Sequence, residues 1–187
     1  SFQVYNNTQR NDVTNQAVNE TYGEILKCGD EIVSAYFYST SCGAGTDATI
    51  WGGANKPYIK GRIISDTNDT TDLTDEENFT GFIKNNYDSY DMGYGFYRWT
   101  LEVTKEDLEK TINEKIGMLY KQSPDKVKTL AEGKYVSKEI ESVGKIKKIE
   151  TGKRMTGGVL HELYIYGSEK TVKVETEYYI RQLIYPV

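Results

Sequence analysis

Apolar positions recur with two different periods along this chain, and together the periods predict an α+β fold. Leu108, Ile112 and Ile116 are spaced four residues apart, which is the buried stripe of a helix over residues 105–116. The last third instead contains short runs typical of strands, at residues 135–140, 145–150, 159–166 and 171–175. A closing helix or strand follows at residues 176–183. We therefore predict a single domain with a largely antiparallel sheet and a few short helices.

Capping residues and shorter apolar runs predict the elements in the middle of the chain. Thr104 and Gly117 would begin and end the helix at residues 105–116. Thr74 would cap another helix, which carries three apolar residues from Phe79 onward and ends near Asn85. Two further segments are expected, a strand at residues 98–103 and a short helix at residues 124–131.

A helix and a hairpin are predicted near the N-terminus. The helix covers residues 15–22 and ends before Gly23, which accepts positive φ. Residues 24–28 and 31–38 then form two strands, because Gly29-Asp30 between them suits a two-residue turn. The second strand leads into residues 39–46 (STSCGAGT), where hydroxyls, backbone amides and glycines are concentrated. Such a loop either brings backbone close to a polar ligand or simply needs glycine for a tight connection.

Composition narrows the possible functions. The net charge of −5 over 187 residues gives no basic surface for nucleic acid, so we expect no nucleic-acid partner. No apolar run has the length of a membrane span. Cys28 and Cys42 are too few for a disulfide framework, and we expect both to be unpaired.

Two segments are unusual in composition. Residues 66–77 are acidic and rich in threonine, and we interpret them as a solvated loop; calcium is the alternative, although the spacing does not fit an EF-hand. Residues 87–97 (YDSYDMGYGFY) are rich in tyrosine and glycine. They form either an aromatic rim over a sugar groove or an ordinary loop packed by its own rings, and we favour the ordinary loop.

No residue pattern identifies a catalytic centre. His161, the sole histidine, lies in a predicted strand and is far in sequence from Cys42. Cys28, Cys42 and His161 would supply the three ligands of a catalytic zinc only by a coincidence of folding. The chain has no phosphate-binding loop, dinucleotide fingerprint or HExxH motif. We therefore predict no metal and no cofactor.

Several segments resemble one family, the stage II sporulation protein D (SpoIID/LytB) family. The similar segments are QVY at 3–5, AVNETYGEIL at 17–26, IVSAYFYSTSCGAGT at 32–46 followed by Trp51, TGG at 156–158, LYIYG at 163–167 and IR at 180–181. The similarity is specific over residues 17–46 and weak over residues 66–127. It implies one SpoIID/LytB-like domain over residues 1–187.

The resemblance implies a function in bacterial cell-wall remodelling or sporulation. Members of the family are lytic transglycosylases that cleave peptidoglycan glycan strands after removal of the stem peptides. One glutamate acts as general acid and base, in an E-M-P-like segment that precedes the QVY element. We expect that segment to lie before Ser1, and therefore expect the chain as given to be catalytically silent, with its catalytic residue unknown. The location implied is extracytoplasmic.

Within this resemblance, six residues are the candidate glycan contacts: Tyr38, Ser39, Ser41, Gly43, Thr46 and Trp51. Hydroxyls and loop amides would bind sugar oxygens, and Trp51 would either stack on a sugar ring or anchor the core. Some family members bind zinc through a histidine and two cysteines. Here Cys42 matches one ligand, while Phe2 replaces another, which supports the prediction of no metal. The alternative function is a noncatalytic module that recruits or stimulates an amidase.

Overall fold

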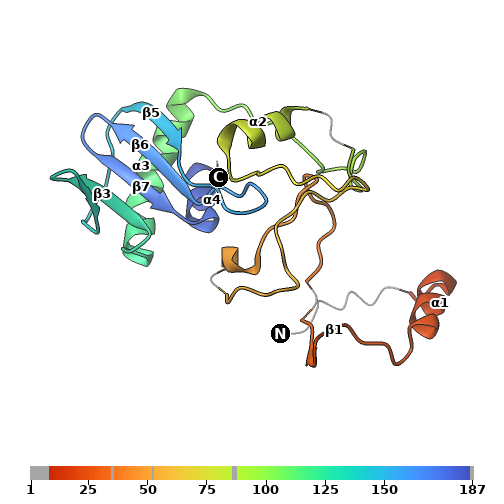
Figure 1. The fold of residues 1–187 in the computed structure, drawn as a ribbon. Coiled ribbons are helices and arrows are strands. Elements are labelled where there is room, and N and C mark those ends of the chain that lie inside the picture. Colours follow the sequence, from red (N-terminus) through yellow and green to blue (C-terminus); the bar gives the residue numbers. More distant parts are fainter. Residues whose placement is uncertain (1–8, 35, 52, 86–87, 186–187) are drawn as a thin grey trace. The chain divides into compact units, whose positions relative to one another are not determined.

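The computed structural model describes residues 9–34, 36–51, 53–85 and 88–185 (Figure 1). The chain divides into two compact units, Ser1–Phe37 and Tyr38–Val187. The predicted α+β class is confirmed, because short helices accompany a mostly antiparallel sheet. Among the described residues, no helix combines the length and the apolar character required to cross a membrane.

The first unit contains the predicted helix, which begins three residues earlier and ends two residues earlier than expected, and the predicted hairpin with shorter strands. Helix α1 (Asp12–Glu20) begins after Asn11, whose side chain accepts a 2.8 Å hydrogen bond from the Thr14 amide. Strands β1 (Lys27–Cys28) and β2 (Glu31–Ile32) pair across the Gly29-Asp30 turn, with Gly29 at a φ of +61°. The hairpin is therefore correct in place and turn, but each strand is shorter than predicted.

Burial explains why the hairpin is short. None of the described residues of this unit is buried, and apolar side chains such as Val18, Leu26 and Ile32 are exposed. A two-stranded hairpin gains little stability in water without a surface to pack against. Beyond the two paired residues of each strand the Val33 amide still donates to the Leu26 carbonyl oxygen at 2.9 Å, but the strand predicted to reach Tyr38 ends at Ile32.

The second unit contains a five-stranded sheet in the order β4-β3-β7-β6-β5 (Figure 1). All neighbouring strands are antiparallel. Their bounds are β3 (Val127–Ala131), β4 (Lys134–Val136), β5 (Ile146–Thr151), β6 (Glu162–Gly167) and β7 (Thr171–Glu175). The four strands expected in the last third are thus present, and β7 has the predicted bounds.

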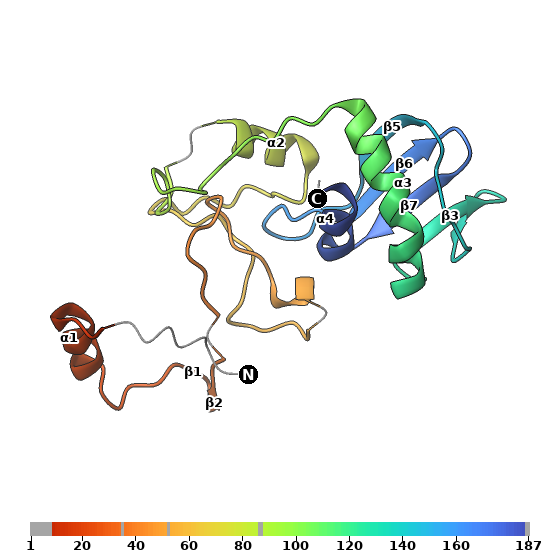
Figure 2. The same cartoon turned by 180° about the vertical axis from the view of Figure 1, so that it is seen from behind.

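Two helices cover one face of this sheet. Helix α3 (Lys105–Gln122) crosses the strands and α4 (Glu177–Ile184) packs beside it, as Figure 2 shows. Alternate residues of the strands point to these helices because successive strand side chains face opposite ways. The resulting core joins residues from α3, α4 and every strand except β4, among them Ile116, Ile165, Val172 and Leu183.

Two predictions around α3 are wrong. The helix does not stop at Gly117 but continues to Gln122, and a Cβ on Gly117 would lie 3.2 Å from the Ile140 carbonyl oxygen. The glycine therefore permits close packing of the helix on a loop and does not terminate it. The helix expected over residues 124–131 is instead β3, because its alternating Val127 and Thr129 face the core.

Residues 38–104 are mostly irregular. They contain a short 3₁₀ helix, η1 (Ala48–Trp51), and helix α2 (Glu76–Lys84) around a small core of Ile63, Leu73 and Phe82. The α2 cap is Asp75, one residue after the predicted Thr74, and its carboxylate accepts a 2.9 Å bond from the Asn78 amide. The strand predicted at residues 98–103 does not form, because no neighbouring strand pairs with it among the described residues.

Candidate functional site

The loop that follows the hairpin, residues 39–46, is called the bend below. It is paired with a second segment of backbone. The Gly45 amide donates to the Arg62 carbonyl oxygen and the Ile64 amide donates to the Gly43 carbonyl oxygen, both at 2.8 Å. These two bonds flank an antiparallel bridge between Ala44 and Ile63. The loop is therefore half of a short two-stranded pairing.

Ser41 is held by Asp91, which lies 50 residues further along the chain. The Ser41 amide donates to Asp91 Oδ2 at 2.8 Å, and the Ser41 hydroxyl donates to the same oxygen. The Ser41 Oγ also accepts a 3.1 Å bond from the Gly43 amide. Bonds to a charged acceptor are about twice as strong as neutral ones, so this carboxylate fixes the bend.

Gly43 is buried beneath side chains from residues 82–97. It has a φ of +98°, and a Cβ there would lie 3.1–3.2 Å from Ser89 Oγ, the Tyr97 hydroxyl and Phe82 Cζ. Only glycine satisfies both the left-handed backbone and the close packing. Arg98 closes the same cluster, since its Nε donates to the Cys42 carbonyl oxygen at 3.2 Å and its guanidinium lies over the Phe82 ring.

The six candidate residues therefore have different surroundings. The polar groups of Ser41 and Gly43 are engaged within the protein, whereas Tyr38 and Ser39 are exposed where the bend begins. The Thr46 hydroxyl donates to the Thr156 carbonyl oxygen at 3.1 Å. Trp51 ends η1, and its side chain lies outside the described part of the structure. None of the other five lines the cavity described next.

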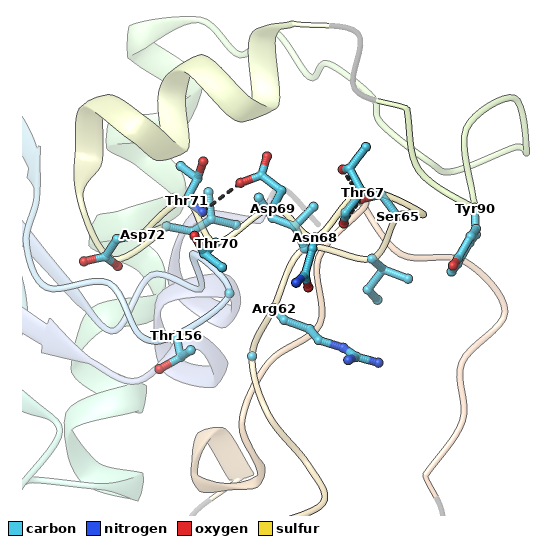
Figure 3. Close-up of a pocket in the computed structure, with 15 residues that line it drawn as sticks. Arg62, Ser65, Thr67, Asn68, Asp69, Thr70, Thr71, Asp72, Tyr90 and Thr156 are labelled. Carbon is cyan, nitrogen blue, oxygen red and sulfur yellow. Dashed lines mark hydrogen bonds between the residues drawn. The ribbon is translucent and has the colours of Figure 1, made fainter.

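A cavity of about 600 Å³ lies beside the strand that pairs with the bend. Residues 61–65, 67–73, 90 and 156–157 line it. In Figure 3 the side chains of Arg62 and Asn68 lie between Tyr90 at one end and Thr156 with Asp72 at the other. The lining combines a cation, carboxylates, an amide and hydroxyls, so it presents both donors and acceptors of hydrogen bonds.

Hydrogen bonds within the lining hold its shape. Asp69 Oδ1 accepts from the Thr71 amide at 2.8 Å, and Asp72 Oδ1 accepts from the Thr74 amide at 2.9 Å. The hydrogen bond from the Thr74 hydroxyl lowers the pKa of Asp72 below its ordinary value. At the other end, the Tyr90 hydroxyl donates to Asp66 Oδ1 at 2.8 Å, and this bond raises the pKa of Tyr90. The acidic loop is thus an ordered wall of the cavity.

The opposite wall, Thr156 and Gly157, packs directly on the bend. Gly157 has a φ of +82°, and a Cβ there would collide with the Gly45 carbonyl oxygen. Substitution of Gly157 would therefore push this wall away from the bend.

Arg154 anchors that wall to α2. Its Nε and Nη2 donate to the two carboxylate oxygens of Glu76 at 2.6 and 2.9 Å, and its Nη1 donates to the Gly158 carbonyl oxygen at 2.8 Å. The guanidinium also stacks 3.8 Å from the centroid of the Phe79 ring. The hydrogen bonds from Arg154 lower the pKa of Glu76 below its ordinary 4.5. This contact joins segments 78 residues apart in sequence.

The other candidate groups for chemistry, Cys28, Cys42 and His161, are not among the residues that line the cavity. Cys28 and Cys42 are both free thiols, as predicted, and fall in different units. The backbone of His161 continues the sheet, because its carbonyl oxygen accepts from the Thr176 amide at 2.7 Å. Within the described residues, no group of three or more His, Cys, Asp and Glu side chains is placed to hold a metal ion.

Sequence reasoning located the bend but not the cavity. Acidic, threonine-rich segments are usually solvated, and nothing in residues 66–77 shows that they face Arg62 and Thr156. The interpretation of residues 87–97 is corrected in part: Tyr97 packs on Arg98, but the Tyr90, Tyr94 and Phe96 side chains are exposed and not packed on one another. Thr156 and Gly157 of the cavity wall belong to the TGG segment at 156–158, which the sequence marked only as similar to the SpoIID/LytB family.

Comparison with known proteins gives one similarity. Residues 46–138 match a domain of unknown function, DUF8618. No curated protein and no solved structure matches the chain. The matched residues contain the Arg62–Leu73 side of the cavity and end two residues after β4, so they include the β3–β4 hairpin of the sheet.

Proposed function

We propose that this protein binds the glycan strands of peptidoglycan, with the cavity beside Arg62 as its sugar-binding site. The observation that carries the proposal is the cavity's lining, which combines hydrogen-bond donors and acceptors and has the aromatic ring of Tyr90 at one end (Figure 3). Sugars present many hydroxyls that both donate and accept, so they require this mixture. A cavity of about 600 Å³ is of the size that holds a small ligand such as one or two sugar units.

The bend supports this site indirectly. It was expected to contact the glycan through Ser41 and Gly43, but its backbone instead positions Arg62 and Ile64 by pairing with them. Thr46 reaches the cavity wall through its bond to Thr156. The segment that resembles the SpoIID/LytB family is thus adjacent to the proposed site, and Tyr38, Ser39 and Trp51 stay candidate contacts beyond the cavity.

The resemblance extends the proposal to glycan processing outside the cytoplasm. Lytic cleavage between the two sugars of the glycan repeat needs one carboxylic acid, which protonates the leaving oxygen and then assists attack by the muramic hydroxyl. We assign that acid to no residue of this chain. The proposed contribution of the chain is to bind and orient the strand.

Binding to glycan strands stripped of stem peptides tests the proposal. We expect the protein to bind them in isothermal titration calorimetry. The double variant Arg62→Ala/Asn68→Ala should bind at least tenfold more weakly, because it loses hydrogen bonds to the sugar. Lys60→Ala is the matched control, because Lys60 is a nearby exposed cation that does not line the cavity. Equal binding by both variants, or no binding by the parent protein, would contradict the proposal.

One observation favours the alternative function, recruitment of an amidase. A second cavity, of about 630 Å³, is lined mainly by apolar side chains, including Trp99, Leu101, Leu160 and Ile184. Exposed aromatic and aliphatic residues around a hollow are typical of protein-binding surfaces. Under this alternative, Trp99→Ala would abolish stimulation of a cell-wall amidase and leave glycan binding intact. Loss of glycan binding in Trp99→Ala would argue against two separate sites.

A further inference from the structure

Residues 90–96 form an aromatic loop, defined here by the exposed side chains of Tyr90, Met92, Tyr94 and Phe96. Their exposed fractions are 60%, 48%, 68% and 88%. Exposed apolar side chains that lie together form the surface through which many proteins bind a partner. The sequence had favoured a loop packed by its own rings, and these exposures show that its rings face solvent.

The aromatic loop is anchored beneath its exposed side chains. Asp91 points inward and accepts both bonds from Ser41. The Met92 amide donates to the Ser89 carbonyl oxygen at 3.0 Å, and the Tyr94 amide donates to the Asp91 carbonyl oxygen at 3.1 Å. A fixed backbone reduces the entropy lost when exposed rings bind a ligand.

The aromatic loop is continuous with the cavity. Tyr90 belongs to both, since its ring lines the cavity and its hydroxyl bonds to Asp66. Met92, Tyr94 and Phe96 follow Tyr90 within six residues of the chain, and their side chains are exposed. The polar cavity and the aromatic loop suit the two surfaces of a sugar chain, its hydroxyl rim and its apolar ring faces.

We propose that the aromatic loop binds sugar units that extend beyond the cavity, so that affinity rises with the length of the glycan. This inference rests on the proposed function and adds to it a second surface, outside the cavity, that contacts further sugar units of the same strand. A lipid surface is the less suitable partner for these rings. Tyr90 is shared with a cavity lined by hydroxyls, carboxylates and an amide, and a bilayer would leave that polar lining without a ligand.

Glycans of two defined lengths test the inference. We expect the parent protein to bind a peptide-free octasaccharide about tenfold or more tightly than the disaccharide, because added rings gain stacking contacts. The double variant Tyr94→Ala/Phe96→Ala should lose this gain and keep the affinity for the disaccharide. Tyr178→Ala, which removes an exposed ring from α4, is the matched control and should retain the gain.

The outcomes separate the two proposals. If the parent protein binds neither glycan, the proposed function fails and this inference fails with it. If both glycans bind but the double variant keeps the full length dependence, only this inference is overturned. Sedimentation with phosphatidylcholine–phosphatidylglycerol vesicles that is lost in the double variant would assign the loop to membranes, and would likewise overturn it. Unchanged thermal melting confirms that the variants are folded.

Discussion

The two halves of the larger unit are stabilised in different ways. Residues 105–185 form a sheet covered by α3 and α4, with a continuous apolar core and regular backbone hydrogen bonds. Residues 38–104 have only a small core, and side chains such as Asp91, Arg98 and Asp75 satisfy their backbone groups. Residues 105–185 are therefore stabilised by burial of apolar side chains, and residues 38–104 by individual polar contacts between distant segments.

This difference places the candidate site. Irregular backbone held by polar side chains leaves amides, carbonyls and charged groups near the surface, where they can bind a polar ligand. The regular half contributes rigidity, and its β5–β6 loop supplies the Thr156–Gly157 wall. We therefore expect substitutions in the sheet to affect the stability of the whole unit, and substitutions around the cavity to have local effects.

The largest effect is expected in the sheet. Ile165→Ala removes a fully buried side chain from β6 and should lower the free energy of unfolding by about 2–5 kcal/mol. Leu130→Ala, at an exposed position on β3, is the control and should lower the free energy of unfolding by much less than Ile165→Ala does. Urea titration followed by circular dichroism measures both. Similar small losses in the two variants would show that the sheet core is not the main source of stability.

A smaller and local effect is expected at the link between the halves. Arg154→Ala removes the bonds to Glu76 and Gly158 and the stacking on Phe79, and should cost about 1–3 kcal/mol. Amide hydrogen exchange should accelerate in residues 152–160 and at the start of α2, while the central strands stay protected. Lys153→Ala, an exposed neighbour, should change neither. Uniform acceleration throughout the sheet would contradict the proposed separation.

The smallest effect is a pH dependence of the same link. Arg154 lowers the pKa of Glu76 in the folded protein, so the stabilisation is present above the ordinary value of 4.5 and is lost as the pH falls through the lowered folded value. Glu76 is partly exposed, so we expect a contribution of about 1 kcal/mol or less. Glu76→Gln should therefore be less stable than the parent protein at neutral pH and equally stable near pH 2. An unchanged difference across that range would exclude this ion pair as its cause.

The two halves also differ in what their sequence could predict. The apolar periodicity of α3 and of the late strands gave their type and order, because burial against a common core imposes that periodicity. The cavity could not be predicted in this way. Its shape depends on pairs such as Ser41 with Asp91 and Arg154 with Glu76, which lie 50 and 78 residues apart and leave no local pattern. The roles of Gly117 and Gly157 could not be predicted for the same reason. Each glycine is required by close packing against a distant segment, and neither ends a helix.

The most direct test of the account is a map of the amides that respond to glycan. Peptide-free glycan strands titrated into the isotopically labelled protein should shift backbone resonances of residues 61–73, Tyr90 and 156–157, and leave those of α3 and β3 unchanged. Shifts confined to the apolar cavity around Trp99, or no shifts at saturating glycan, would contradict the claim that the polar cavity is the sugar-binding site.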